Sequence, residues 1–536
     1  MGRAGFAVLV GLVAAAAAAA ELAIQGTNKA EFWLYQQDYA THLENKLDLN
    51  LRYGDLRGGL GAFLYEPSKP WNADQQPLRL LDYTIAYSPK MLEVLYGKFY
   101  QTFGKGLALR TYSDDDFRHY KSLNGLRGIA RLPRQTELVL LGARMRDIFF
   151  QENTYKVMNA DSVHADTTDQ VLGANVESRP LSFLDVGGRY VRVNRTQDME
   201  QYPSPDSWPK IFNELYGGNL AVTAGPIELY GEVCQRLGTK PYVGGREKGL
   251  GYYTTGTAAV GGFAVMGEYM DYDKLGFPDV VLAGRKTYRY TDPPTPIKSG
   301  VAINRGVDER GLGVSASGTP VGPLYVEANF GRLYTHDTTA VPVSFGEGLG
   351  PGFDSILRSM AVWYGVNSYA SVDEAEGKVR YSLGTDWTFE GKFNHMVQKN
   401  IELHVASRTT DMPTVHVNYL LGQHTFALEA DYDFVAEDTG GMATPLKYHE
   451  AAIAVSYGYG SAWLFTVGWQ YVDMKLDRRY NGEQSWPVVE AVWSITNRNM
   501  LRVRVGAERG GYTCSGGVCR EEAPFNGIKA QLISTF

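Results

Sequence analysis

The sequence LENKLDLNLRY, residues 43–53, alternates apolar and polar side chains with a period of two. The apolar positions hold Leu43, Leu47, Leu49, Leu51 and Tyr53, and the polar positions hold Glu44, Lys46, Asp48, Asn50 and Arg52. Successive residues of a β-strand point to opposite faces of the sheet. This stretch therefore predicts a strand with one apolar face and one charged face.

The same alternation recurs at residues 379–389, 426–434 and 501–508. A soluble sandwich would turn such apolar faces inward, whereas a membrane barrel turns them to lipid and its charged faces to an aqueous lumen. Strands of about ten residues, alternating short turns and longer loops, and aromatic residues near strand ends favour the barrel. We therefore predict an all-β fold, a single antiparallel transmembrane β-barrel of about 20–24 strands spanning residues 21–536.

The first 20 residues carry the parts of a secretory signal peptide. Arg3 precedes an apolar run from Gly5 to Ala20, which ends in three alanines directly before Glu21. This order of charge, apolar stretch and small residues predicts export. After Glu21 no run of 18 apolar residues occurs, so helical membrane spans are not expected.

The end of the chain also has a recognisable pattern. Ile528, Ala530, Leu532, Ser534 and Phe536 share one strand face. The stretch resembles the terminal strand of outer-membrane barrel proteins, whose final Phe is read by the barrel-assembly machinery. That resemblance implies a location in the cell outer membrane, with outer-membrane lipid and this machinery as partners.

Two further stretches are similar to segments of a family of uncharacterised predicted outer-membrane barrels. They run from Gly97 to Arg110 and from Cys514 to Arg520, ahead of the final strand. The family has no activity that could be carried over, so the resemblance supports the fold and leaves the function open.

The alternation breaks down over residues 103–124, between two strong strand signals. This segment has early glycines and then mixed charges, among them Asp115, Asp116, Arg118 and Lys121. It fits either a surface loop or an inward-folded constriction or plug, because glycines permit a sharp departure from a strand. In the second case we expect its charges to pair with lumen charges such as Glu44 and Arg52. We also predict that Arg144 and Arg146 line the lumen.

Other chemistry has little support in the sequence. Cys514 and Cys519 are predicted to form a disulfide in the oxidising periplasm, and Cys234 is predicted to stay free. No Cys-x-x-Cys, metal-binding or cofactor motif occurs, and no nucleophile–base pairing can be inferred, so we predict neither a cofactor nor an enzyme. The net charge of −7 gives no reason to expect nucleic acid.

Two functions are compatible with this sequence. The first is a channel or transporter for small solutes with a partly occluded lumen, because an unfilled barrel of this size would leak. The alternative is a structural or scaffold barrel that encloses or anchors a partner, such as a lipoprotein or a periplasmic protein.

Overall fold

The computed structural model describes most of the chain after the predicted signal peptide, which itself lies outside the described residues. The described ranges are 22–36, 41–67, 78–114, 119–149, 169–195, 211–239, 246–276, 281–282, 285–286, 290–299, 308–336, 370–402, 405–438, 445–473, 484–509, 511–515, 518–522 and 525–536. Within these ranges no helix has the length and apolar character needed to cross a bilayer.

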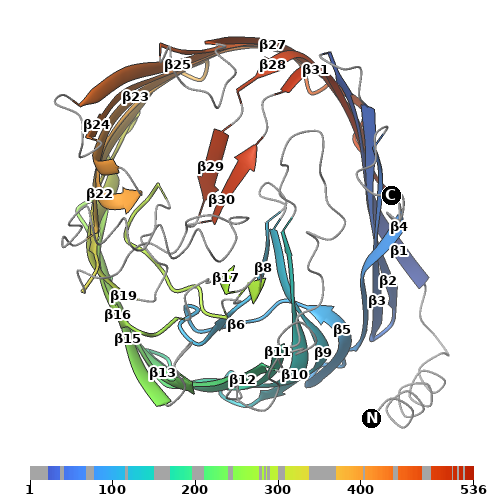
Figure 1. Cartoon of the computed structure of the whole chain (residues 1–536), viewed down its shortest axis with the longest axis vertical. Coiled ribbons are helices and arrows are strands. Elements are labelled where there is room, and N and C mark those ends of the chain that lie inside the picture. Colours follow the sequence, from blue (N-terminus) through green and yellow to red (C-terminus); the bar gives the residue numbers. More distant parts are fainter. Residues whose placement is uncertain are drawn as a thin grey trace.

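In the described part of the chain, twenty-four long strands pair antiparallel in one closed sheet (Figure 1). They are β1 (Leu22–Tyr35), β2 (Thr41–Tyr53), β3 (Leu56–Pro67), β4 (Leu78–Tyr87), β5 (Leu92–Phe99), β9 (His119–Leu132), β10 (Thr136–Phe149), β11 (Asp169–Leu181), β12 (Leu184–Arg195), β13 (Ile211–Ala224), β14 (Ile227–Thr239), β15 (Arg246–Val260), β16 (Phe263–Asp273), β19 (Asp308–Val321), β20 (Leu324–Tyr334), β21 (Ser371–Leu383), β22 (Trp387–Glu402), β23 (Val405–Leu421), β24 (His424–Asp438), β25 (Leu446–Tyr459), β26 (Trp463–Val472), β27 (Ser485–Thr496), β28 (Asn499–Glu508) and β31 (Phe525–Thr535).

Seven shorter strands belong to the long connections. They are β6 (Thr102–Phe103), β7 (Leu109–Arg110), β8 (Tyr112–Asp114), β17 (Val281–Leu282), β18 (Arg285–Lys286), β29 (Gly511–Ser515) and β30 (Val518–Glu522). In the view of Figure 1 the β29–β30 hairpin and β6 lie within the outline of the ring.

The barrel closes where β1 pairs with β31. Their register runs from Thr27 opposite Thr535 to Tyr35 opposite Gly527. Beyond it, the backbone N–H of Gly26 donates to the Phe536 carbonyl at 2.9 Å, and the Phe536 N–H donates back at 3.1 Å. Among the twenty-four described long strands, closure leaves no edge of the ring unpaired, which is the condition for β-strands to cross a hydrocarbon layer.

The barrel is apolar outside and polar inside. Outward residues such as Leu140, Leu172 and Val467 are at least half exposed, whereas the inward residues Arg189 and Glu374 are buried. An exposed apolar belt on a closed barrel has a stable environment only in lipid, so the protein is an outer-membrane β-barrel, as the alternation predicts.

Aromatic residues lie on this outer surface toward both ends of the strands. Trp387 and Trp463 open β22 and β26 at one end, and Tyr432, Phe434 and Trp469 lie in the halves of their strands nearer the other end. All five are more than a third exposed. This placement matches the two aromatic girdles of outer-membrane barrels, which sit at the two interfaces of the bilayer.

Tight turns lie at one end of the barrel and longer connections at the other. The turn end carries the predicted turns after Tyr53, Leu132 and Ala224, and by the rule for such barrels it faces the periplasm. One alternating run was misassigned. Residues 379–389 form a hairpin rather than one strand, because β21 ends at Leu383 and β22 begins at Trp387 after a three-residue turn.

Candidate functional site

Residues 101–112, called insert 1 below, leave the wall after β5 and pack against the inner face of the barrel. Phe103, Leu107 and Leu109 are fully buried. They belong to one apolar cluster with the inward residues Val139 of β10 and Val171 of β11. Insert 1 therefore lies on the lumen side of the wall.

A buried ion pair lies beneath the tip of insert 1. The side chains of Arg189 on β12 and Glu232 on β14 are fully buried, and their charged groups are 2.6 Å apart. The backbone N–H of Lys105 donates to Glu232 Oε2 at 2.8 Å, as does the Tyr230 hydroxyl at 2.5 Å. Hydrogen bonds of this kind offset the cost of burying a charge pair.

Gly104 is required at this contact. Its φ is +57°, and a β-carbon at this position would lie 1.4 Å from a guanidinium nitrogen of Arg189. Any side chain here would both strain the backbone and displace the ion pair. The glycine-rich start of the segment therefore serves close packing on the wall.

Residues 290–299, called insert 2 below, continue the inner layer that insert 1 begins. The Arg110 N–H donates to the Tyr290 carbonyl at 2.8 Å, and the Asp292 N–H donates to the Gly106 carbonyl at 3.2 Å. These two bonds join the inserts to each other. Insert 2 thus extends from insert 1 along the inner wall.

Insert 2 then passes over a glycine-lined part of the wall. Pro296 lies where β-carbons would project from Gly311 and Gly313 of β19, at 3.0 Å and 2.8 Å from its ring atoms. The absence of side chains at these positions lets the insert backbone approach the sheet closely.

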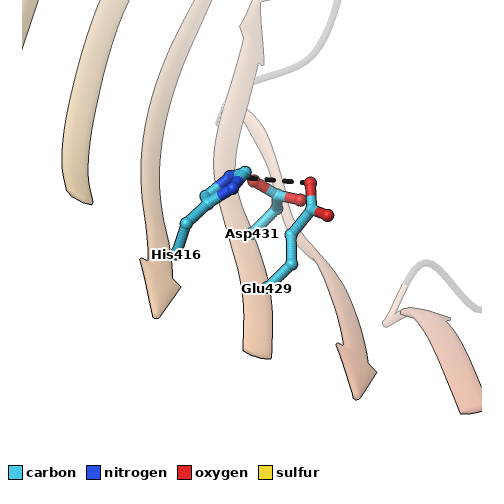
Figure 2. A group of neighbouring side chains, drawn as sticks. All are labelled: His416, Glu429 and Asp431. Carbon is cyan, nitrogen blue, oxygen red and sulfur yellow. Dashed lines mark ion pairs between the residues drawn. The ribbon is translucent and has the colours of Figure 1, made fainter. Parts of the chain in front are cut away.

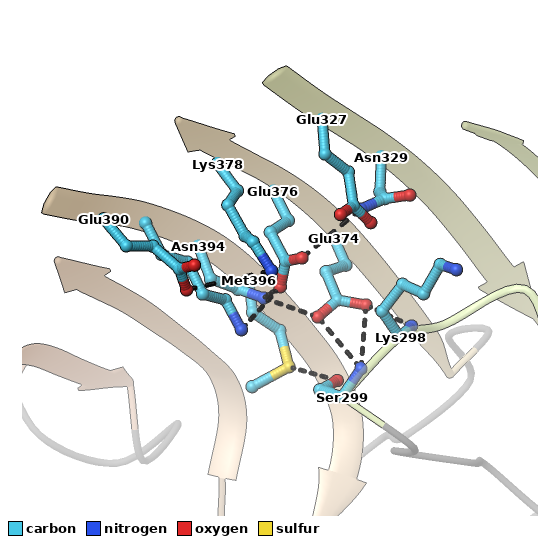
Figure 3. A network of polar contacts seen from close by, with 11 residues as sticks. Lys298, Ser299, Glu327, Asn329, Glu374, Glu376, Lys378, Glu390, Asn394 and Met396 are labelled. Atoms are coloured by element: carbon cyan, nitrogen blue, oxygen red, sulfur yellow. Dashed lines mark hydrogen bonds and ion pairs between the residues drawn. The ribbon is translucent and has the colours of Figure 1, made fainter. Parts of the chain in front are cut away.

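The end of insert 2 is held by a buried carboxylate, shown in Figure 3. Glu374 of β21 is 3% exposed. It accepts hydrogen bonds from the backbone N–H groups of Lys298 at 2.7 Å and Ser299 at 3.1 Å, and from the Asn394 side-chain amide at 2.7 Å. Three donors satisfy the charge of this carboxylate, so the contact fixes where insert 2 ends.

The inner wall beyond the inserts is lined mostly by paired charges. Glu390 pairs with Arg380 at 2.7 Å, and Glu437 pairs with Arg408 at 2.7 Å. The sign of the lining is mixed, as the sequence predicts for the charged faces of these strands.

A small cavity of about 230 Å³ lies against β2, β4 and β5, beside the two ends of insert 1. Its lining residues are Lys46, Asp48, Leu81, Asp82, Thr84, Lys98, Tyr100 and Ser113. Lys98 Nζ and Asp82 Oδ2 are 2.5 Å apart within this lining.

One group of inward polar side chains, on β23 and β24, has carboxylates that are not paired with a lysine or arginine among the described residues. His416 of β23 lies opposite Glu429 of β24, with Nε2 and Oε1 3.5 Å apart, and Asp431 follows two residues along β24 (Figure 2). The three side chains point toward one another, and their ligand atoms lie within 4.8 Å of one another. Among the described residues, no lysine or arginine forms an ion pair with either carboxylate.

The predicted constriction residues are dispersed. Asp115, Asp116 and Arg118 lie outside the described residues. Lys121 is 3% exposed and belongs to β9, so residues 119–124 are part of the barrel wall rather than of an inserted segment. The hydrogen-bonded ladder to β10, which continues to His119, overrides the irregular local sequence.

Glu44 and Arg52 lie far apart on β2. Glu44 is buried on the inner face of β2, whereas Arg52 is exposed near the turn end of the same strand. Eight residues of extended strand separate them by about 26 Å. Glu44 and Arg52 are therefore too far apart to belong to one compact cluster of lumen charges.

The prediction that Arg144 lines the lumen is wrong. Its strand is apolar on both faces, and the buried residues Val139, Leu141 and Met145 show which face points inward. Arg144 is exposed and shares the outward face with Leu140. For Arg146, only the backbone position in β10 is described.

The structure also places the three cysteines and the C-terminal residue that the sequence analysis singled out. Cys234 is a free, buried thiol in the apolar cluster on the inner face of β14. Cys514 and Cys519 lie directly opposite each other in the β29–β30 hairpin. Phe536 is exposed on the outer face at the turn end, next to Gly26.

Sequence analysis did not bring His416, Glu429 and Asp431 together, and it missed the residues that hold insert 2. A signal for the first exists, because β23 and β24 are joined by a tight turn with Leu421 opposite His424. Counting outward from that turn places His416 opposite Glu429. The Glu374 contact has no such local signal, because it joins residues about 75 positions apart.

Comparison with known families finds one family model that matches most of the barrel. A family model described as "Family of unknown function (DUF6029)" matches residues 8–278 and 381–536. The chain belongs to this family. No curated protein matches it in sequence.

Several solved structures are similar to this chain. The siderophore receptor PirA from Pseudomonas aeruginosa is 8% identical, with a TM-score of 0.46 over 96% of this chain and 80% of that one. The copper transporter OprC is 10% identical, with a TM-score of 0.45 over 96% and 81%. A mutant of the ferric enterobactin receptor PfeA from Pseudomonas aeruginosa is 9% identical, with a TM-score of 0.46 over 97% and 82%. Likeness this distant says nothing about what this chain binds.

Proposed function

We propose that this barrel is a channel or transporter for small solutes, with a lumen narrowed by insert 1 and insert 2. The observation that carries the proposal is the packing of both inserts against the inner wall, from β10 to β21, by buried apolar and hydrogen-bonded contacts. Segments built into a lumen in this way restrict a passage without disrupting the barrel around it.

The size of the barrel supports the same conclusion. Strands about 4.8 Å apart and tilted by about 40° give a 24-stranded ring a backbone diameter on the order of 45–50 Å. An open passage of that width would admit large molecules. Partial filling by the inserts, together with a charged lining, would leave a route for small polar solutes.

The partners that follow from this proposal are outer-membrane lipid and the barrel-assembly machinery, with the C-terminal strand that ends in Phe536 as the assembly signal. A lipoprotein or other periplasmic partner belongs to the alternative, in which the barrel is a scaffold around another protein.

Removing insert 1 tests the proposal. Its base is already closed, because the Thr111 N–H donates to the Gln101 carbonyl at 3.0 Å and the Gln101 N–H donates to Thr111 Oγ1 at 2.7 Å. Residues 102–110 can therefore be replaced by Asn-Gly, which favours a tight hairpin turn. This variant should show about twofold or more higher single-channel conductance in planar bilayers, because the lumen widens.

Lys105→Ala is the matched control, because it removes one exposed charge of insert 1 and leaves the rest of the insert in the lumen. Heat-modifiability on gels verifies that each variant is folded. Unchanged conductance in the folded replacement variant would contradict a narrowing role for insert 1. If the wild type and the variant are both silent, the scaffold alternative replaces the channel.

A further inference from the structure

We infer that His416, Glu429 and Asp431 form a binding site for a divalent transition-metal ion, such as Zn²⁺, on the lumen wall. One imidazole and two carboxylates provide a borderline nitrogen ligand and two hard oxygen ligands. This combination suits zinc and its first-row neighbours better than calcium or magnesium, which prefer oxygen ligands alone. Two carboxylates also neutralise the charge of a divalent ion.

The geometry requires little movement. Two ligand atoms bound to one ion at about 2.1 Å lie at most about 4.2 Å apart. His416 Nε2 and Glu429 Oε1, at 3.5 Å, are already within that limit. The largest separation in the group is under 4.8 Å, so a rotation of the Asp431 side chain completes the set. Figure 2 shows all three side chains on the same side of the paired strands.

The backbone under the site is preorganised. β23 and β24 form one ladder in which His416 faces Glu429, and Asp431 faces Thr414. β24 pairs with β23 from Thr414 to Leu421 and with β25 along nearly its whole length. This pairing fixes the three Cα positions, so binding an ion orders only side chains.

The neighbouring strand leaves space for the ion. On β25 the residues opposite Glu429 and Asp431 are Ala454 and Ala452. Their methyl groups leave the lumen side of the carboxylates open to an ion and its remaining water ligands. A metal site built from three protein ligands keeps such open positions.

The charge environment also favours a cation. Elsewhere on the inner wall, acidic side chains such as Glu390, Glu437 and Glu490 are each paired with an arginine. Among the described residues, Glu429 and Asp431 have no such partner, and Asp433 follows them on the same face. This stretch of β24 therefore carries negative charge that a bound metal ion would balance.

The test is metal binding by the full-length barrel, purified in detergent without a histidine tag and freed of metal by a chelator. Titration with Co²⁺, followed by its visible absorption, and with Zn²⁺, followed by calorimetry, should find one site per chain containing these ligands. His416→Gln should weaken binding at that site at least tenfold, and Glu429→Gln and Asp431→Asn should each weaken it.

His395→Gln is the matched control. His395 pairs with Asp411 at 2.6 Å on the outward face of the same strand β23 and its neighbour β22, and no third ligand group is found there among the described residues. Its loss should leave the metal affinity unchanged. Equal affinity and stoichiometry in wild type and His416→Gln would overturn the inference, as would a wild type that binds neither ion.

A bound Cu²⁺ ion provides an independent readout. Its electron paramagnetic resonance spectrum should carry the coupling of a single imidazole nitrogen, and this coupling should vanish in His416→Gln. Because binding is measured in detergent, the result does not depend on conductance. A failure of the channel proposal and a failure of the metal site are therefore distinguishable.

Discussion

The buried pair Arg189–Glu232 shows how single residues hold an inserted segment inside a barrel. Both side chains are fully buried, yet Glu232 also accepts the N–H of Lys105 from insert 1. Burying two charges is unfavourable unless hydrogen bonds satisfy them. The ion pair on the wall therefore holds insert 1 through a polar contact in an otherwise apolar interface. Gly104 lets the insert backbone approach Arg189 closely.

Also at the residue scale, we predict that Cys514 and Cys519 are joined in the exported protein, while Cys234 stays free. Directly opposite residues of an antiparallel pair have Cα atoms about 4.5–5.5 Å apart, which is within the range of a disulfide. Thiol labelling after unfolding without reductant should find one reactive cysteine per chain, and three after reduction. Cys514→Ser should raise the unreduced count to two; three labelled cysteines in the unreduced wild type would refute the bridge.

At the scale of elements, the two inserts form one inner layer that depends on contacts at both ends. Insert 1 is held by the Arg189–Glu232 pair, and insert 2 is held by Glu374. The hydrogen bonds between Arg110 and Tyr290 and between Asp292 and Gly106 join them. Loss of either contact should loosen the layer, because these two contacts hold its opposite ends on the wall.

We predict that Glu374→Leu releases the end of insert 2 without unfolding the barrel. The substitution removes both acceptor oxygens for the Lys298 and Ser299 amides. Hydrogen bonds to charged groups contribute about 1.5–3 kcal/mol each, so exchange at these amides should accelerate about tenfold or more. Hydrogen exchange followed by mass spectrometry measures this effect.

Glu327→Leu serves as the control for that experiment. Glu327 lies in the same polar network but bonds to Asn329 and Tyr325 rather than to the insert backbone. Exchange at residues 298–299 should therefore be unaffected. Equal acceleration in both variants would show that Glu374 does not clamp insert 2 specifically.

At the scale of the whole molecule, the stability of the barrel depends on an apolar outer surface in lipid and a polar inner surface in the lumen, the reverse of the arrangement in a soluble protein. Val467 is 60% exposed near the middle of β26, on the outer belt. Its neighbour Thr466 points inward, where its hydroxyl lies 2.8 Å from that of Ser456. Val467 thus faces lipid and the adjacent Thr466 faces the lumen. The same substitution at these two positions tests whether the outer surface lies in lipid.

Val467→Arg should destabilise the assembled barrel by about 2–4 kcal/mol, because it places a charge near the middle of the bilayer. Thr466→Arg should have a much smaller effect, because its side chain enters the polar lumen. Urea unfolding in lipid vesicles, followed by heat-modifiability on gels, measures both. If the two variants are equally stable, the outer surface of β26 does not face lipid.

The sequence predicts the local periodicity correctly but fails where both faces of a strand are apolar. In β10 the inner residues Val139, Leu141 and Met145 are apolar because insert 1 covers them. The alternation that identifies faces elsewhere is therefore lost, and Arg144 was assigned to the wrong side. The buried thiol of Cys234 on β14 belongs to the same apolar cluster as insert 1.

Local sequence patterns were enough to predict a barrel of antiparallel strands, most of its tight turns and most of its lipid-facing surface. These features follow from period-two alternation and tight-turn residues, which are local properties of the chain. The packed barrel was needed to see that residues 101–112 and 290–299 share one inner layer. It also shows that Glu374 holds the end of this layer and that three ligand groups meet at His416. These contacts join residues distant in sequence or on separate strands, and closure of the barrel fixes which of them face one another.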